Sequence, residues 1–282
     1  MLKHGRKLGF PLGGNDYICD LRVEADLMDT SVITEGKFRY IEFGEGTPIV
    51  VLHGLMGGLS NFGGVSSFFP EKGYKVILPE LPIYDMPMLK TTVKHFAKFV
   101  AEFLEHKGLD EVLLLGNSLG GHVGLLFTKM YPEKVKGLII TGSSGLYESA
   151  MGDSYPKRGS YEFIEKKAQD VFYDPAVATK EIVDEVYATV NDRVKLVKTL
   201  AIAKSAIRHN MAKDLPKMPT PTCIIWGKND SVTPPEVAEE FHTLLPDSDL
   251  YWIDKCGHAP MMEHPDTFNE LLYAWLLARK FQ

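Results

Sequence analysis

Short apolar runs rich in β-branched residues recur along the chain, at 48–52, 74–78, 111–115, 135–141, 222–226 and 250–253. Runs of this length, bounded by turn-forming residues, are typical of strands that are buried on both faces. Two segments between or after them have helical spacing instead, with apolar stripes at Val93, Phe96, Val100, Phe103 and Leu104, and at Phe268, Leu271, Leu272, Trp275 and Leu276. The alternation predicts an α/β fold with a mostly parallel central sheet flanked by helices.

One long segment interrupts the alternation. Residues 144–215 show no strand pattern, whereas 179–190 and 193–208 have helical patterns. A glycine- and serine-rich stretch leads into the segment, and the proline-rich KDLPKMPTPT leads out of it. We therefore expect one core, 1–143 and 216–282, with a helical cap inserted at 144–215. Because the insertion follows a central strand, we expect it over the carboxyl edge of the sheet, where such folds bind ligands.

Composition excludes several classes of protein. The 282 residues are 45% hydrophobic and 24% charged, which is ordinary for a globular chain, and the net charge of -6 argues against nucleic acid as a partner. Three widely spaced cysteines, Cys19, Cys223 and Cys256, form no CxxC pair, so we expect reduced thiols. The amino terminus lacks the apolar stretch of a signal peptide, and no run is long enough to span a membrane. We expect a cytoplasmic protein.

The segment LLLGNSLGGHVGLLF carries the strongest chemical signal. Between a predicted strand and a predicted helix it contains Gly116, Ser118 and Gly120, the G-x-S-x-G pattern of a nucleophile elbow. The turn is so tight that side chains at the two glycine positions would clash with the neighbouring strand or helix. The serine hydroxyl would project into the cleft, with a helix amino terminus behind it. We therefore expect Ser118 to be a nucleophile.

A serine nucleophile needs a histidine base and an acceptor that orients the histidine. Of the nine histidines, His258 in CGHAP is the one that follows a strand end late in the chain, and we expect it to be the base. We expect structural roles for the others considered, which are His53, His95, His106 and His122. Asp230 in IIWGKND directly follows a strand and is the predicted orienting carboxylate. Asp254, four residues before the histidine, is expected to be a surface group.

The remaining site predictions are main-chain donors and pocket residues. The tetrahedral intermediate needs two amide donors, and we expect these from the N–H groups of Leu55, in HGLMGG, and Leu119. Candidate pocket residues are Met56, Asn117, Met261 and Met262. The methionines fit an apolar, adaptable pocket, and they fit core packing equally well.

Together, LHGLMGG, GNSLGG, WGKND and GHAPMMEHPDTFNELLYAWL resemble the α/β-hydrolase superfamily, in its single-domain branch with a helical cap. The resemblance spans about 36–280 and implies a substrate pocket roofed by helices. Asn117 before the serine is similar to the GNS form of meta-cleavage product hydrolases, which cut carbon–carbon bonds. Those enzymes usually carry tryptophan after the catalytic histidine, where this chain has Ala259. They also carry a cap arginine, and none of Arg158, Arg193 and Arg208 is assigned to that role.

These patterns favour hydrolysis of a small apolar carboxylic ester through an acyl-enzyme on Ser118. A C–C hydrolase acting on a vinylogous 1,5-diketone is the first alternative, and a ligand-binding receptor or scaffold on the same fold is the second. The chain has no HExxH, no P-loop and no dinucleotide fingerprint, so neither a metal nor a cofactor is expected. The expected partner is a small molecule, and the sequence does not predict an oligomeric state.

Overall fold

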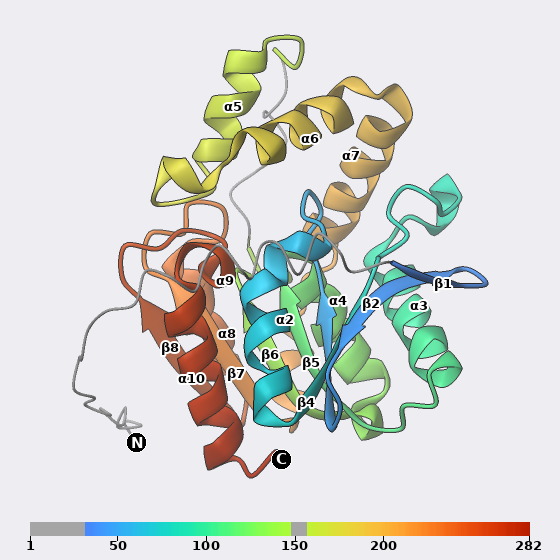
Figure 1. The fold of residues 1–282 in the computed structure, drawn as a ribbon, viewed down its shortest axis with the longest axis vertical. Coiled ribbons are helices and arrows are strands. Elements are labelled where there is room, and N and C mark those ends of the chain that lie inside the picture. Colours follow the sequence, from blue (N-terminus) through green and yellow to red (C-terminus); the bar gives the residue numbers. More distant parts are fainter. Residues whose placement is uncertain (1–31, 148–156) are drawn as a thin grey trace.

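The computed structural model describes residues 32–147 and 157–282, which form one eight-stranded sheet flanked by helices (Figure 1). The spatial order of the strands is β1-β2-β4-β3-β5-β6-β7-β8. Their bounds are β1 Ile33–Glu35, β2 Phe38–Phe43, β3 Thr47–Leu52, β4 Tyr74–Pro79, β5 Val112–Asn117, β6 Val135–Thr141, β7 Thr222–Gly227 and β8 Ser248–Ile253. The predictions about Cys19 and about a signal peptide concern residues 1–31, which lie outside the described part of the chain.

The prediction of a mostly parallel sheet is confirmed. All six expected strands are present as β3 to β8, and neighbours among them pair in parallel. The sequence analysis missed β1 and β2 at one edge of the sheet, where β1 pairs antiparallel with β2, and β2 pairs antiparallel with β4. In β2, which lies between β1 and β4, buried and exposed positions are mixed, because an antiparallel strand can face water on one side. Such a strand contains no continuous apolar run, so the pattern that located the other six strands does not identify it.

Helices cover both faces of the sheet. The helices are α2 Gly63–Phe68, α3 Val93–His106, α4 Leu119–Met130, α5 Tyr161–Gln169, α6 Lys180–Asn191, α7 Arg193–Arg208, α8 Pro235–Leu244, α9 Pro260–Glu263 and α10 Pro265–Ala278. Alternate residues of β3 divide between two apolar clusters, Val50 and Leu52 in one and Ile49 and Val51 in the other. The first cluster includes apolar residues of α3, α4 and α8, and the second those of α2 and α10.

Helices α5, α6 and α7 lie between β6 and β7 in the chain, within the segment expected to be an insertion. Figure 1 shows α5 and α6 beyond one end of the sheet and α7 leading back toward α4. Ile202 and Ala206 of α7 join the core cluster on the α3 and α4 face, so this segment is anchored there. Residues 148–156 of this segment lie outside the described part. Among the described helices, none has the length and apolar character needed to cross a membrane.

Candidate active site

Ser118 occupies a strained turn between β5 and α4. Its backbone angles are φ 54° and ψ -119°, a combination that costs a non-glycine residue about 1–3 kcal/mol. Main-chain bonds hold the turn on both sides. The Ser118 N–H donates to the Thr141 carbonyl at the end of β6 (3.1 Å), and the Ser118 carbonyl accepts from the N–H of His122 in α4 (3.1 Å). The surrounding sheet and helix therefore impose the strain at this serine.

Two glycines permit the turn, as the sequence predicts. A Cβ at Gly116 would lie 2.4 Å from the carbonyl oxygen of Gly120, and a Cβ at Gly120 would lie 2.0 Å from the carbonyl oxygen of Leu52. Both distances are far shorter than a carbon and an oxygen tolerate, and the clashing atoms belong to the backbone. Any larger residue at either position would push α4 away from β3 or β5.

His258 and Asp230 meet at the carboxyl ends of β8 and β7, which are neighbours in the sheet. The Nδ1 of His258 donates to Asp230 Oδ2 at 2.9 Å, and both side chains are buried. Asp230 Oδ1 accepts the backbone N–H groups of Val232 and Thr233, and Oδ2 accepts the Thr233 hydroxyl. A fully bonded carboxylate therefore fixes the ring and its tautomer, leaving the lone pair of the neutral imidazole on Nε2.

His53 and Asp254, which the sequence analysis assigned to roles outside the catalytic group, bond to groups other than His258 and Asp230. The ring of His53 is buried and bridges two main-chain groups, the Gly54 carbonyl at Nδ1 and the Leu81 N–H at Nε2 (2.9 Å each). Burial also lowers the pKa of His53, which favours the neutral ring. Asp254 is exposed and lies 3.6 Å from Lys228, so it does not support His258.

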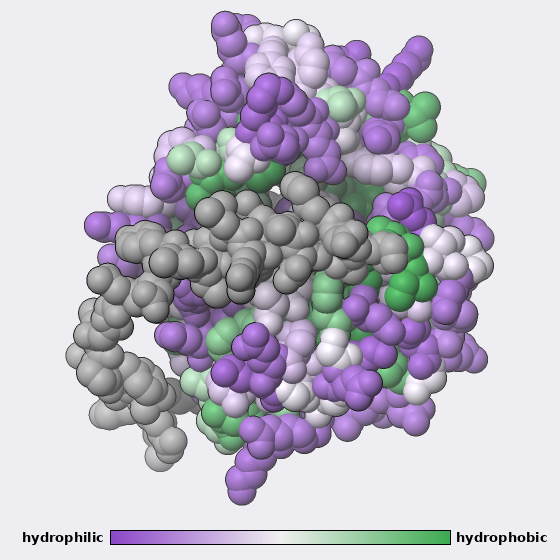
Figure 2. Space-filling model, in the orientation of Figure 1, coloured by the Kyte–Doolittle hydropathy of each residue, from purple (hydrophilic) through white to green (hydrophobic). Residues whose placement is uncertain are grey.

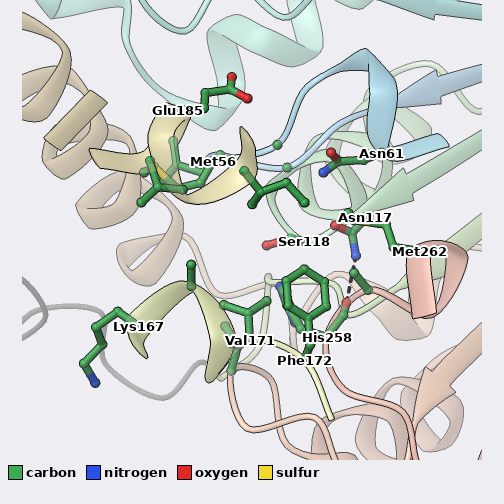
Figure 3. A pocket seen from close by; sticks show the side chains of 18 of the residues that line it. Met56, Asn61, Asn117, Ser118, Lys167, Val171, Phe172, Glu185, His258 and Met262 are labelled. Atoms are coloured by element: carbon green, nitrogen blue, oxygen red, sulfur yellow. Dashed lines mark hydrogen bonds between the residues drawn. The ribbon is translucent and has the colours of Figure 1, made fainter. Parts of the chain in front are cut away.

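One cavity brings Ser118 and His258 together (Figure 3). Its walls are largely apolar and include Val171, Phe172 and Val186 from the segment between β6 and β7. Its free volume is about 150 Å³, which suits a group about the size of a benzene ring. Sequence reasoning missed these three residues, because nothing in the helical pattern of the insertion shows which of its positions meet the serine.

The other predicted site residues divide between the cavity and the core. Leu55, Met56 and Met262 line the cavity. Met261 is buried in the cluster formed with α10. Leu119 begins α4 directly after the serine, and its side chain is buried in the opposite cluster, so only its backbone N–H is suited to the site.

Asn117 borders the cavity, but its amide group is engaged by the protein itself. Its Nδ2 donates to the carbonyl oxygens of Thr141 and His258, at 3.1 Å each. Figure 3 shows the bond to His258 as a dashed line. Asn117 therefore ties the end of β5 to the loop that carries the histidine, a contact between residues 141 positions apart.

Glu263 in α9 ties the histidine loop to the inserted segment. Its Oε1 accepts the N–H of Gly257 at 2.7 Å, and its Oε2 accepts the N–H groups of Tyr173 and Asp174 at 2.7 and 3.3 Å. The N–H of His258 donates in turn to the Val171 carbonyl. One carboxylate thus fixes the loop before His258 against the loop that lines the cavity, and we interpret Glu263 as a positioning residue.

Replacing this carboxylate by its amide tests the interpretation. Glu263→Gln places an NH2 group against at least one N–H donor, because an amide has a single acceptor oxygen. We expect kcat to fall roughly ten-fold to a hundred-fold while KM changes much less, because the histidine is misplaced by a fraction of an ångström. Steady-state kinetics on an ester substrate measure both constants. Glu270→Gln, at an exposed position of α10, is the matched control. Equal losses in the two variants, or a change in KM alone, would contradict the positioning role.

A second buried histidine packs behind the elbow. His122 in α4 is fully buried, and its Nε2 lies 3.0 Å from Nδ1 of His209, the residue that follows α7. One ring must donate and the other accept, so the contact requires at least one neutral ring. Burial, together with the neighbouring His209, lowers the pKa of His122 to about 3.

The stability of the fold should therefore fall in mild acid. In the unfolded chain His122 regains its ordinary pKa of 6.5, so below that pH the unfolded state binds a proton that the folded state excludes. We expect His122 to reduce the free energy of unfolding by about 1.4 kcal/mol per pH unit as the pH falls from 6.5 toward 3. Urea denaturation of wild type and His122→Gln at about pH 7 and about pH 5 measures this contribution. If the free energies of unfolding of the two proteins differ by the same amount at both pH values, the predicted contribution of His122 is contradicted.

Comparison with known proteins shows the family of the chain. Residues 47–171 match a family model described as alpha/beta hydrolase fold. A solved α/β hydrolase enzyme from the metagenome of sediments from the lagoon of Mar Chica, Morocco, is 63% identical, covering 89% of this chain and 99% of its own, with a TM-score of 0.75. The chain belongs to the α/β-hydrolase family, and the family resemblance noted in the sequence is confirmed.

More distant relatives differ in the reactions their names state. The 2-hydroxy-6-oxo-6-(2'-aminophenyl)hexa-2,4-dienoic acid hydrolase of Metapseudomonas resinovorans is 28% identical, over 86% of this chain and 88% of its own length. An esterase from Exiguobacterium antarcticum shares the fold at 22% identity and a TM-score of 0.74, covering 88% of this chain and 98% of its own. The chain is therefore a hydrolase, and its substrate class has to be argued from the site.

Proposed function

We propose that the protein is a serine hydrolase that cleaves carboxylic esters of small apolar acids. One observation carries the proposal. A serine held in a strained elbow shares an apolar cavity with a histidine whose Nδ1 is bound by a buried, fully bonded carboxylate. In this proposal Ser118 is the nucleophile, His258 the general base and Asp230 the group that orients the histidine.

The reaction proceeds in two halves. Ser118 Oγ attacks the ester carbonyl while Nε2 of His258 takes the hydroxyl proton, and the amides of Leu55 and Leu119 stabilise the oxyanion. Collapse of the tetrahedral intermediate breaks the bond to the alkoxide, which leaves as an alcohol with the proton from His258. Water, deprotonated by the same nitrogen, then cleaves the acyl-enzyme and releases the acid. Asp230 keeps Nδ1 protonated throughout and stabilises the imidazolium that forms in each half.

The cavity favours a neutral acyl group. Its lining combines Leu55, Met56, Val171, Phe172, Val186, Val232, Ala259 and Met262, and the described lining residues include no arginine. Lys167 and Glu185 also border it, and Figure 3 shows both charged groups directed away from Ser118. A substrate carboxylate placed near the serine would lose its hydration without a cation in return, which is costly in an apolar site. A neutral acyl chain gains from the same walls.

C–C bond hydrolysis is the second candidate. It is supported by relatives named for 2-hydroxy-6-oxo-dienoic acids and by the asparagine before the nucleophile, in GNS. The substrates in those names are carboxylic acids, whereas this cavity offers no described arginine to receive one. Ala259 after the histidine also departs from the tryptophan usual in that group. Both features support ester hydrolysis over C–C bond hydrolysis as the proposed function.

We further propose that residues 144–215 act as a cap over this site. Val171, Phe172, Ile182 and Val186 reach the cavity from that segment, and the bonds of Glu263 anchor it to the histidine loop. The cap would then set substrate size and exclude water from the acyl-enzyme.

A substrate comparison tests the proposed function. Purified protein is assayed with p-nitrophenyl esters of neutral acids, with the matched hemisuccinate ester, and with 2-hydroxy-6-oxo-6-phenylhexa-2,4-dienoate. We expect neutral esters to be preferred over the charged ester by at least about ten-fold in kcat/KM, and little cleavage of the dienoate. A preference for the dienoate would establish the C–C hydrolase instead. Failure of a fluorophosphonate probe to label Ser118 would favour an inert scaffold.

A further inference from the structure

Helix α7 exposes four apolar side chains on the side that faces away from the core. Its inner face packs into the core through Leu196, Ile202 and Ala206. Its outer face carries Val194, Val197, Leu200 and Ile207, whose exposed fractions are 63%, 46%, 37% and 51%. Spacings of three, three and seven residues place these four on one side of the helix. Arg193, Lys204 and Arg208 lie on the same side of the helix at helical spacing, so this outer face mixes exposed apolar and basic side chains.

A neighbouring loop extends this apolar surface. The short helical turn Met88–Lys90 precedes α3 and exposes Met88 and Leu89, the latter to 91%. The loop is fastened along α7, because Lys198 Nζ donates to the Tyr84 carbonyl and the Val93 N–H donates to Ser205 Oγ at 3.3 Å. Figure 2 shows apolar surface among hydrophilic side chains along the right-hand edge, where α7 and this loop lie.

The same surface is strongly basic. Helix α7 has five basic residues and no acidic one, and 84–98 adds three lysines against the single Asp85. None of these eight takes part in an ion pair within the described residues; they are Lys90, Lys94, Lys98, Arg193, Lys195, Lys198, Lys204 and Arg208. The whole chain has a net charge of -6, so this basic surface stands out from the rest of the molecule.

We propose that this surface, the outer face of α7 with Met88 and Leu89, docks the protein onto anionic phospholipid bilayers. Exposed apolar side chains mixed with lysine and arginine suit the bilayer interface, where apolar side chains reach the acyl chains and cations meet the headgroups. A second copy of this chain fits less well, because two such surfaces would bring like charges together. Docking would hold the inserted segment that lines the cavity at the lipid surface.

Vesicle flotation tests the proposal with the full chain. The vesicles contain phosphatidylcholine alone, or phosphatidylcholine with about one third phosphatidylglycerol. Wild type should float with the anionic vesicles at low salt, float much less at high salt, and not float with the neutral vesicles. Lys204→Glu with Arg208→Glu should lower the bound fraction at least about ten-fold. Val194→Ser with Val197→Ser should also lower it, since both side chains lose their contact with the acyl chains.

A matched charge change serves as the control. Lys72→Glu with Lys280→Glu alters the net charge equally at two exposed residues outside this surface and should leave flotation unchanged. Circular dichroism and thermal melting show that each variant is folded. Equal loss in the control, equal binding to neutral vesicles or no binding at all would overturn the proposal. A dimer in the absence of lipid would also overturn the proposal, if sedimentation shows that Val194→Ser with Val197→Ser dissociates it.

Discussion

Ser118→Ala is expected to lower kcat/KM on ester substrates by at least about three orders of magnitude, because the variant has no oxygen to form the acyl-enzyme. Binding should survive, since the cavity walls are unchanged and the removed atom contributes little apolar area. The variant should also lose labelling by a fluorophosphonate, which peptide mass spectrometry locates on the wild-type chain.

Ser118→Gly separates the chemistry from the strain of the elbow. Glycine also lacks the nucleophile, so this variant should be as inactive as the alanine variant. Glycine adopts φ 54° without penalty, however. The free energy of unfolding of Ser118→Gly should therefore be about 1–2 kcal/mol higher than that of Ser118→Ala. Urea denaturation measures the difference. Comparable turnover by wild type and either variant would rule out Ser118 as the nucleophile.

Asp230→Asn should produce the second large loss, about three to four orders of magnitude in kcat/KM. The asparagine fills the same space but has one acceptor oxygen where Asp230 serves four donors, from Val232, Thr233 and His258. The amide NH2 therefore faces a donor, and the histidine shifts to the wrong tautomer or loses its orientation. The imidazolium that forms during the reaction also loses its counter-charge.

Asp254→Asn is the matched control for this prediction. It removes the other carboxylate near the histidine in sequence, at an exposed position paired with Lys228. Its kcat/KM should stay within about two-fold of wild type, because surface ion pairs contribute little. Similar losses in both variants would show that a general charge effect, and not the bond to Nδ1, supports the reaction.

The sequence alone predicts much of the proposed site because the patterns that point to it are local. The strand-to-helix turn around Ser118 is encoded in six consecutive residues, and the glycines there are required by contacts within the same turn and with the adjacent strand. The carboxylate after β7 and the histidine after β8 could be predicted because parallel neighbours end at the same edge of a sheet. Apolar runs likewise located all six parallel strands.

Only the tertiary structure decided the contacts that fix and line the site. Asn117 appeared from the sequence to be a pocket residue, and the fold occupies its amide with carbonyls 24 and 141 residues away. Met262 lines the cavity while its neighbour Met261 enters the core, a choice set by the direction of one short helix. Glu263 was part of a recognised motif, yet two of its partners, Tyr173 and Asp174, lie 90 and 89 residues away, in the segment between β6 and β7. Local pattern determines backbone conformation and burial, whereas side-chain partners depend on how distant elements pack, which no local window of sequence contains.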